Sequence, residues 1–134
     1  MYILLDFDGT CVTHEYPYIG KDIGAVPVLQ RLVKAGHELI LWTMRSGKSE
    51  KDAELWFRDN NIPLWSIGYN PTQDSWTTSN KAYAQLYIDD AALGCPLIYP
   101  KKDEFGIPTL GLRPFVDWIK VEKMLIDNGI LNDK

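Results

Sequence analysis

Two aspartates stand two residues apart, directly behind a short apolar run near the start of the chain. The run is Tyr2-Ile3-Leu4-Leu5, and the motif that follows it is Asp6-Phe7-Asp8-Gly9-Thr10. Strand residues alternate between faces, so Asp6 and Asp8 point the same way while the strand lasts. Burial and a like charge nearby both raise the pKa of a carboxyl group, so two ionised carboxylates here are unfavourable in free energy. A bound cation or a role in chemistry would explain why they are present. Taken alone, the motif is also compatible with a surface turn rich in Asp and Gly.

Further polar residues follow two other apolar runs. Thr43 comes after the run 38–42, and Asp89-Asp90 end the run 84–88. The carboxyl ends of parallel strands share one sheet edge, where α/β proteins collect ligands. Four carboxylates meeting there would repel one another, and a hard, oxygen-preferring cation such as Mg²⁺ fits them best. The structural alternatives are a helix N-cap for Asp89-Asp90 and a β-favouring residue at a strand end for Thr43.

The elements that must position these residues alternate between strand and helix. Strands are predicted at residues 2–6, 38–42, 64–68 and 84–88, with a short fifth at 95–99. Helices are predicted at 26–35, from Ser46 or Ser49 to about Asn60, and over 114–128. The last of these has an apolar stripe formed by Phe115, Trp118, Ile119, Leu125 and Ile126. Such alternation is typical of parallel βαβ units.

We therefore predict one α/β domain over residues 1–134, a Rossmann-like three-layer α/β/α fold with a central, mostly parallel sheet. A chain of 134 residues is long enough to bury a real core. Residues 11–24 form a polar and aromatic excursion, which we call the flap, and residues 69–80 form a loop. Both insertions are too short for an additional domain.

Composition narrows the classes of partner. The net charge of −4 and pI near 5.1 argue against broad nucleic-acid binding and leave room for a local basic patch. No apolar run approaches the roughly 20 residues that span a bilayer, and the N-terminus lacks the features of a signal peptide. Cys11 and Cys95 are too few and too far apart for a disulfide framework or a zinc site. These features predict a cytosolic protein with reduced thiols.

The predicted site could carry out phosphoryl transfer. A carboxylate beside Mg²⁺ is a competent nucleophile toward phosphorus, and a second carboxylate can protonate the leaving oxygen and then activate water. A hydroxyl group and a lysine are also needed to hold the phosphoryl oxygens as charge develops. Thr43 and Lys81 are the candidates for these two roles.

Four segments resemble, in order, the four motifs of the haloacid dehalogenase superfamily. They are Asp6-Phe7-Asp8-Gly9-Thr10, Leu41-Trp42-Thr43, Lys81, and Tyr87-Ile88-Asp89-Asp90. The likeness covers roughly residues 1–100, and within the superfamily the chain is similar to small phosphatase-like proteins of bacteria and phages. It implies a Mg²⁺-dependent phosphatase acting on a phosphomonoester through an aspartyl phosphate.

The resemblance also implies a role for each matched residue. Asp6 would be the nucleophile and a metal ligand, and Asp8 the acid/base, with its backbone carbonyl on the metal. Thr43 and the Met44 amide would bind phosphate. Lys81 would neutralise it, and Asp89 and Asp90 would complete the metal site, Asp90 directly or through water.

Two departures from the family pattern matter. Lys81 stands only eight residues before Asp89, closer than is usual in the superfamily, and Lys48 after the second strand is its rival. The positions where cap domains are inserted hold only the flap and the loop 69–80, so the protein resembles the capless members. An open site suits a large phosphorylated substrate, or a small one covered by a neighbouring subunit of a homo-oligomer.

Two other functions are compatible with these residues. A receiver-like phosphoryl switch also gathers Asp, Thr, Lys and Mg²⁺ at a sheet edge, although its acceptor follows the third strand. The other alternative is a catalytically quiet metal-binding protein. Outside the motifs, Arg45 is interpreted as a solvated residue, and His14 and His37 as exposed or hydrogen-bonded structural residues. A substrate role for His14 is the alternative, because it lies in the flap.

Overall fold

The centre of the protein is a four-stranded parallel sheet, seen in a computed structural model that describes residues 1–107, 109 and 113–133. Its strands, in the spatial order β3-β2-β1-β4, are Ser66–Ile67, Glu38–Leu41, Tyr2–Leu5 and Leu86–Ile88. Neighbouring strands run parallel throughout. All four lie within the predicted ranges.

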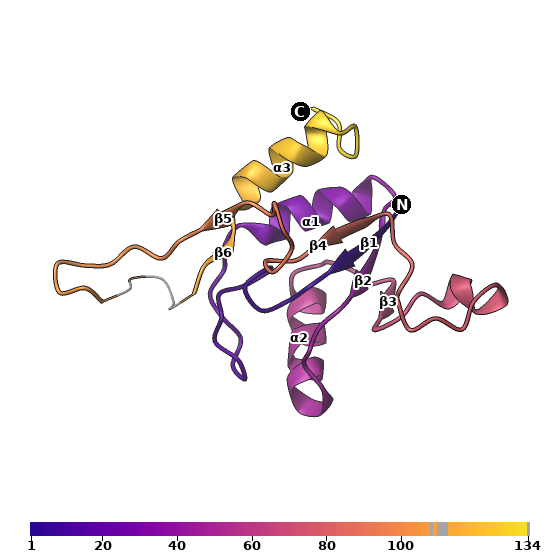
Figure 1. Ribbon diagram of the computed structural model, residues 1–134, viewed down its shortest axis with the longest axis horizontal. Coiled ribbons are helices and arrows are strands. Elements are labelled where there is room, and N and C mark those ends of the chain that lie inside the picture. Colours follow the sequence, from indigo (N-terminus) through magenta and orange to yellow (C-terminus); the bar gives the residue numbers. More distant parts are fainter. Residues whose placement is uncertain (108, 110–112, 134) are drawn as a thin grey trace.

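Three helices flank this sheet (Figure 1). They are α1 (Ala25–Lys34), α2 (Gly47–Asp59) and α3 (Trp118–Asp127). Helix α2 begins directly after Ser46 and ends before Asn60, as predicted. The α/β class, the parallel sheet and the absence of a cap domain are confirmed for the described residues.

The main core lies on one face of the sheet. Alternate strand residues Ile3, Leu5, Leu39 and Leu41 are buried there together with apolar side chains of all three helices. The opposite face carries Tyr2 and also the buried residues Leu4 and Ile40. On this face the ring of Tyr2 contacts the rings of Trp65 and Tyr83. The loop between β3 and β4 contributes Tyr83 and contains a short 3-10 helix, η1 (Pro71–Ser75).

The C-terminal region differs from the prediction. Leu97–Ile98 forms β5, but it pairs antiparallel with β6 (Phe115–Val116) instead of joining the main sheet. Phe115 is therefore a strand residue, and α3 starts only at Trp118, after Asp117 accepts a hydrogen bond from the Lys120 amide. Ile119 is 85% exposed, so its place in the apolar stripe was wrong. The stripe uses Val121 instead.

The flap is a small folded excursion from the carboxyl end of β1. Val12 bridges to both Asp8 and Asp22, and the Thr13 amide donates to the Lys21 carbonyl at 3.0 Å. In Figure 1 the flap and the hairpin between β5 and β6 both extend from the carboxyl side of the sheet, whereas η1 lies at the other side. The flap therefore lies at the sheet edge where the sequence predicts the site.

The state of the two cysteines and the character of the helices can also be compared with the sequence analysis. Both Cys11 and Cys95 are free thiols, and burial raises the pKa of each. Among the described residues, no helix has the length and apolarity needed to cross a membrane.

Candidate functional site

The C-terminal segment fixes the loop that carries the first aspartate motif. The Val116 amide donates to the Gly9 carbonyl at 3.0 Å, and the Trp118 indole N–H donates to the Thr10 carbonyl at 2.7 Å. Trp118 is buried, as predicted. Because β6 and α3 each hold one backbone carbonyl of this loop, the motif is held in place from a distant part of the chain.

Three of the four predicted aspartates form one group, which we call the acidic cluster. One carboxylate oxygen from each of Asp6, Asp89 and Asp90 lies within 4.8 Å of the others. Strand pairing explains the meeting, since Leu5 lies opposite Ile88 and the Asp6 amide donates to the Ile88 carbonyl at 3.1 Å. The sequence prediction that distant acidic pairs converge is therefore confirmed for these three residues.

Thr10 links two members of the acidic cluster, Asp6 and Asp90. Its hydroxyl group donates to Asp6 Oδ2 at 2.7 Å and accepts from the Asp90 amide at 3.0 Å. Thr10 is buried, so these hydrogen bonds are shielded from water. The result is a fixed orientation for Asp6, with one of its oxygens occupied by the hydroxyl group.

His14 reaches the acidic cluster from the flap. Its Nε2 atom lies 2.8 Å from Asp90 Oδ2, and both side chains are 14% exposed. Gly9, with a positive φ of 79°, makes room for this contact, because a Cβ atom there would collide with His14 Nε2 and Asp90 Oδ2. His14 is thus a hydrogen-bonded residue, as interpreted, and it borders the candidate site.

The ionised forms of Asp6 and Asp89 in the acidic cluster are disfavoured. Burial raises the pKa of Asp6 from 3.8 to about 7, against a hydrogen bond from Thr10 that lowers it, and Asp89 and Asp90 raise it further. Burial also raises the pKa of Asp89, against a hydrogen bond from the Ala91 amide that lowers it, and Asp90 raises it further. A divalent cation between these oxygens would favour their ionised forms.

We therefore expect the protein without a divalent cation to lose stability as the pH rises from about 4 to about 7. In this window Asp6 keeps its proton in the folded state and has lost it in the unfolded state. Since the folded state binds more protons, the free energy of unfolding falls with rising pH. Thermal unfolding in EDTA on both sides of this window measures the effect. Asp6→Asn should reduce the difference in Tm, and a Tm as high at the upper end would contradict the account.

The fourth aspartate, Asp8, has a different partner. Its two carboxylate oxygens accept from Nε and Nη2 of Arg45 at 2.8 and 2.7 Å. The Arg45 side chain is only 1% exposed and that of Asp8 18%, so the interpretation of Arg45 as a solvated residue was wrong. The Asp8 carboxylate stands outside the acidic cluster. The predicted contact between its backbone carbonyl and a metal stays a prediction.

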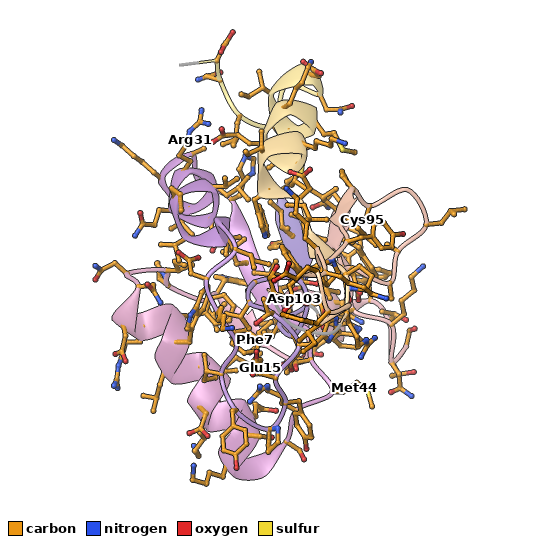
Figure 2. All side chains as sticks on the ribbon, turned by 90° about the vertical axis from the view of Figure 1, so that its left-hand side faces the viewer. Phe7, Glu15, Arg31, Met44, Cys95 and Asp103 are labelled. Atoms are coloured by element: carbon orange, nitrogen blue, oxygen red, sulfur yellow. The ribbon has the colours of Figure 1, made fainter. Side chains whose placement is uncertain are left out.

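Thr43 and Met44 follow β2 at the same edge of the sheet. Leu41 pairs with Leu5, so the residues after both strands emerge side by side. The Thr43 hydroxyl accepts from the Arg45 amide at 3.1 Å, and Met44 is almost fully exposed, at the periphery of the view in Figure 2. Their phosphate-binding roles stay predictions.

The structure does not bring Lys81 to the acidic cluster. Its segment joins η1 to β4 at the amino side of the sheet, where the Gln85 amide donates to the Tyr2 carbonyl (Figure 1). The exposed Lys81 lines a hollow with Trp76 and other aromatic residues, none of which belongs to the candidate site. Lys48, its rival, is exposed at the start of α2, where its ammonium group lies 3.1 Å from Asp52.

Sequence analysis missed the parts played by Arg45 and Thr10, and it did not place His14 beside Asp90. The signal for Arg45 was charge balance, because four converging carboxylates call for a cation and an arginine follows Thr43 by two residues. Thr10 stood within the quoted motif without a role. For His14 the sequence offered only its place in the flap.

The donors present fit a divalent cation. Three carboxylates offer the oxygen ligands that hard cations prefer, and burial and neighbouring carboxylates raise the pKa of Asp6 and Asp89, so a cation would favour their ionised forms. Asp8, in contrast, is already neutralised by Arg45. The site therefore combines one carboxylate group suited to a metal with one held by a protein cation.

The fold and site together define an α/β protein with an acidic, potential metal-binding centre at the carboxyl edge of a parallel sheet. No family model matches the chain, and no curated protein matches it. A solved structure of a conserved protein from Bacteroides thetaiotaomicron matches with a TM-score of 0.73 and 32% sequence identity. The match covers 96% of this chain and 91% of that one. The chain belongs to the same family as this conserved protein.

Proposed function

We propose that the protein is a Mg²⁺-dependent phosphatase of the haloacid dehalogenase type that hydrolyses a phosphomonoester through an aspartyl phosphate. The observation that carries this proposal is the acidic cluster, which joins the aspartate after β1 to the pair after β4. The sequence motifs that resemble the superfamily supply Asp6 and Asp89 to this cluster, and the parallel sheet and capless fold agree with the same class.

Asp6 is the proposed nucleophile. Thr10 occupies Oδ2 of Asp6, which fixes the side chain and leaves Oδ1 for attack or for a metal. Attack on phosphorus forms the Asp6–phosphoryl bond and breaks the bond to the leaving oxygen, which takes a proton from Asp8. A cation held by Asp6, Asp89 and Asp90 would neutralise the charge between the nucleophile and the phosphate.

Asp8 is the proposed proton carrier between the two halves of the reaction. Each of its oxygens accepts one hydrogen bond from Arg45 and keeps a second lone pair, so it can receive a proton without losing the pair. In the second half, water attacks phosphorus and gives its proton to Asp8 as the bond to Asp6 breaks. That proton then serves the next leaving group, so the cycle is balanced.

Turnover of p-nitrophenyl phosphate tests the proposal. We expect hydrolysis that requires Mg²⁺, stops in EDTA and returns when Mg²⁺ is restored, because the acidic cluster repels an anionic substrate without a cation. The control is the same assay with Na⁺ in place of Mg²⁺ at equal ionic strength. Stable phosphorylation without turnover would favour the receiver-like switch, and Mg²⁺ binding without either would favour the quiet metal-binding protein.

A further inference from the structure

Arg45 uses all five N–H groups of its guanidinium within the protein. Two of them bind Asp8, as described above. Nη1 donates to the carbonyls of Pro17 and Ser49, each at 3.1 Å, and the second Nη2 hydrogen donates to the Tyr18 carbonyl at 2.8 Å. A single side chain thus connects the first aspartate motif, the flap and the first turn of α2.

Two aromatic rings complete the surroundings of this guanidinium. Its central carbon lies 5.1 Å from the centroid of Phe7 and 5.3 Å from that of Tyr16. Phe7 belongs to the core, whereas Tyr16 belongs to the flap and is largely exposed on its other side. The flap therefore contributes a ring and two carbonyl groups to the burial of Arg45.

Among the residues that the structure describes, few other polar contacts hold the middle of the flap. The Tyr18 amide donates to the Glu15 carbonyl at 2.8 Å, which is a contact within the flap itself. The contacts of Pro17 and Tyr18 with Arg45 join this segment to the body of the protein. Hydrogen bonds from a charged, planar and buried fork are the strong kind, and a lysine cannot reproduce their geometry.

We propose that Arg45 is a positioning residue that locks the flap against Asp8, so that the flap is a fixed wall of the site and the Asp8 carboxylate has one orientation. The flap lock follows from the contacts alone. The effect on Asp8 rests on the proposed phosphatase function, so the two parts need separate measurements.

Amide hydrogen exchange tests the lock without any enzyme assay. In Arg45→Lys we expect the Thr13 and Tyr18 amides to exchange at least about tenfold faster than in the wild type, because the flap opens locally. The Trp42 amide, which donates to the Leu5 carbonyl inside the sheet, should keep its protection and so excludes global unfolding. Arg58→Lys, in an exposed pair with Asp59, is the matched control and should change neither.

The positioning of Asp8 is tested by comparing two leaving groups. Phenolate needs protonation far more than p-nitrophenolate, so a misplaced acid slows phenyl phosphate more. We expect Arg45→Lys to lower kcat/KM for phenyl phosphate at least about tenfold more than for p-nitrophenyl phosphate. Equal losses for the two esters, or a smaller loss for phenyl phosphate, would overturn the positioning role.

One further measurement needs no variant. In the wild-type protein, NMR should show separate, slowly exchanging Nη hydrogens for Arg45, since all four of them donate hydrogen bonds. Averaged signals there, or flap amides as protected in Arg45→Lys as in the wild type, would overturn the lock. A wild-type protein that hydrolyses neither ester would refute the proposed function and with it the role at Asp8, while the exchange data still decide the flap lock.

Discussion

Replacement of Asp6 by asparagine is expected to abolish turnover and yet to make the cation-free protein more stable. Asparagine has nearly the same shape but cannot form the acyl phosphate, so kcat should fall at least about a thousandfold. Stability should rise because the carboxylate of Asp6 is disfavoured by burial and by Asp89, as its raised pKa shows. Near pH 8 in EDTA, we expect a gain of about 1–3 kcal/mol in the free energy of unfolding.

The two effects of Asp6→Asn are measured by steady-state kinetics and by urea unfolding. Mg²⁺ should stabilise the wild type and have a much smaller effect on the variant, because one of three carboxylate ligands is lost. Asp103→Asn, at an exposed residue after β5, is a suitable control for a change of one charge and should alter neither. Activity retained by Asp6→Asn would remove the nucleophile from the account.

Replacement of Asp8 by alanine should lower both activity and stability. The change takes away the proposed proton carrier, for which we expect a loss of about 10²–10⁴-fold in kcat/KM for phenyl phosphate. It also leaves the guanidinium of Arg45 buried without its counter-charge. Breaking such a pair from one side should cost about 2–4 kcal/mol, toward the lower end because Asp8 is partly exposed.

Asp8→Asn separates these two losses. Its amide oxygen still accepts a hydrogen bond from Arg45, so its unfolding free energy should lie between those of Asp8→Ala and the wild type, while its activity stays low. Asp59→Ala, which removes an exposed partner of Arg58, should change stability by no more than about 0.5 kcal/mol. If Asp8→Ala were as stable as the wild type, the Asp8–Arg45 pair would make no contribution to the free energy of unfolding.

We therefore expect two aspartates separated by one residue to have opposite effects on stability. Asp6 lies beside the carboxyl groups of Asp89 and Asp90, whereas the charge of Asp8 is balanced by the guanidinium of Arg45. Their spacing in the sequence, which suggests one shared metal, hides this difference. The distinction arises only when the flap and the segment after β2 fold over Asp8.

The sequence predicted the parallel sheet and the meeting of Asp6 with the second acidic pair. Those results follow from local rules, because buried parallel strands read as continuous apolar runs and their carboxyl ends must share an edge. The burial of Arg45 could not be predicted in this way. It depends on backbone carbonyl groups of the flap, and such groups leave no mark in the side-chain pattern.

The predictions that differ from the structure do so for a similar reason. Lys81 was assigned by its order among the motifs, but its segment approaches β4 from the amino side of the sheet (Figure 1). Phe115 and Ile119 were assigned to one helical stripe, whereas Phe115 pairs with Ile98 in a separate two-stranded sheet. In both cases the assignment came from a local pattern, whereas tertiary placement decided where the residue lies.

Direct detection of the intermediate tests the central claim most sharply. The Asp8→Asn variant should be mixed with p-nitrophenyl phosphate and Mg²⁺, quenched in acid within the first turnover, digested and examined by mass spectrometry. The account predicts one phosphoryl group on the peptide that begins the chain, located on Asp6, and none in the matching sample of Asp6→Asn. A phosphoryl group on another residue, or release of p-nitrophenol by Asp6→Asn at the wild-type rate, would contradict it.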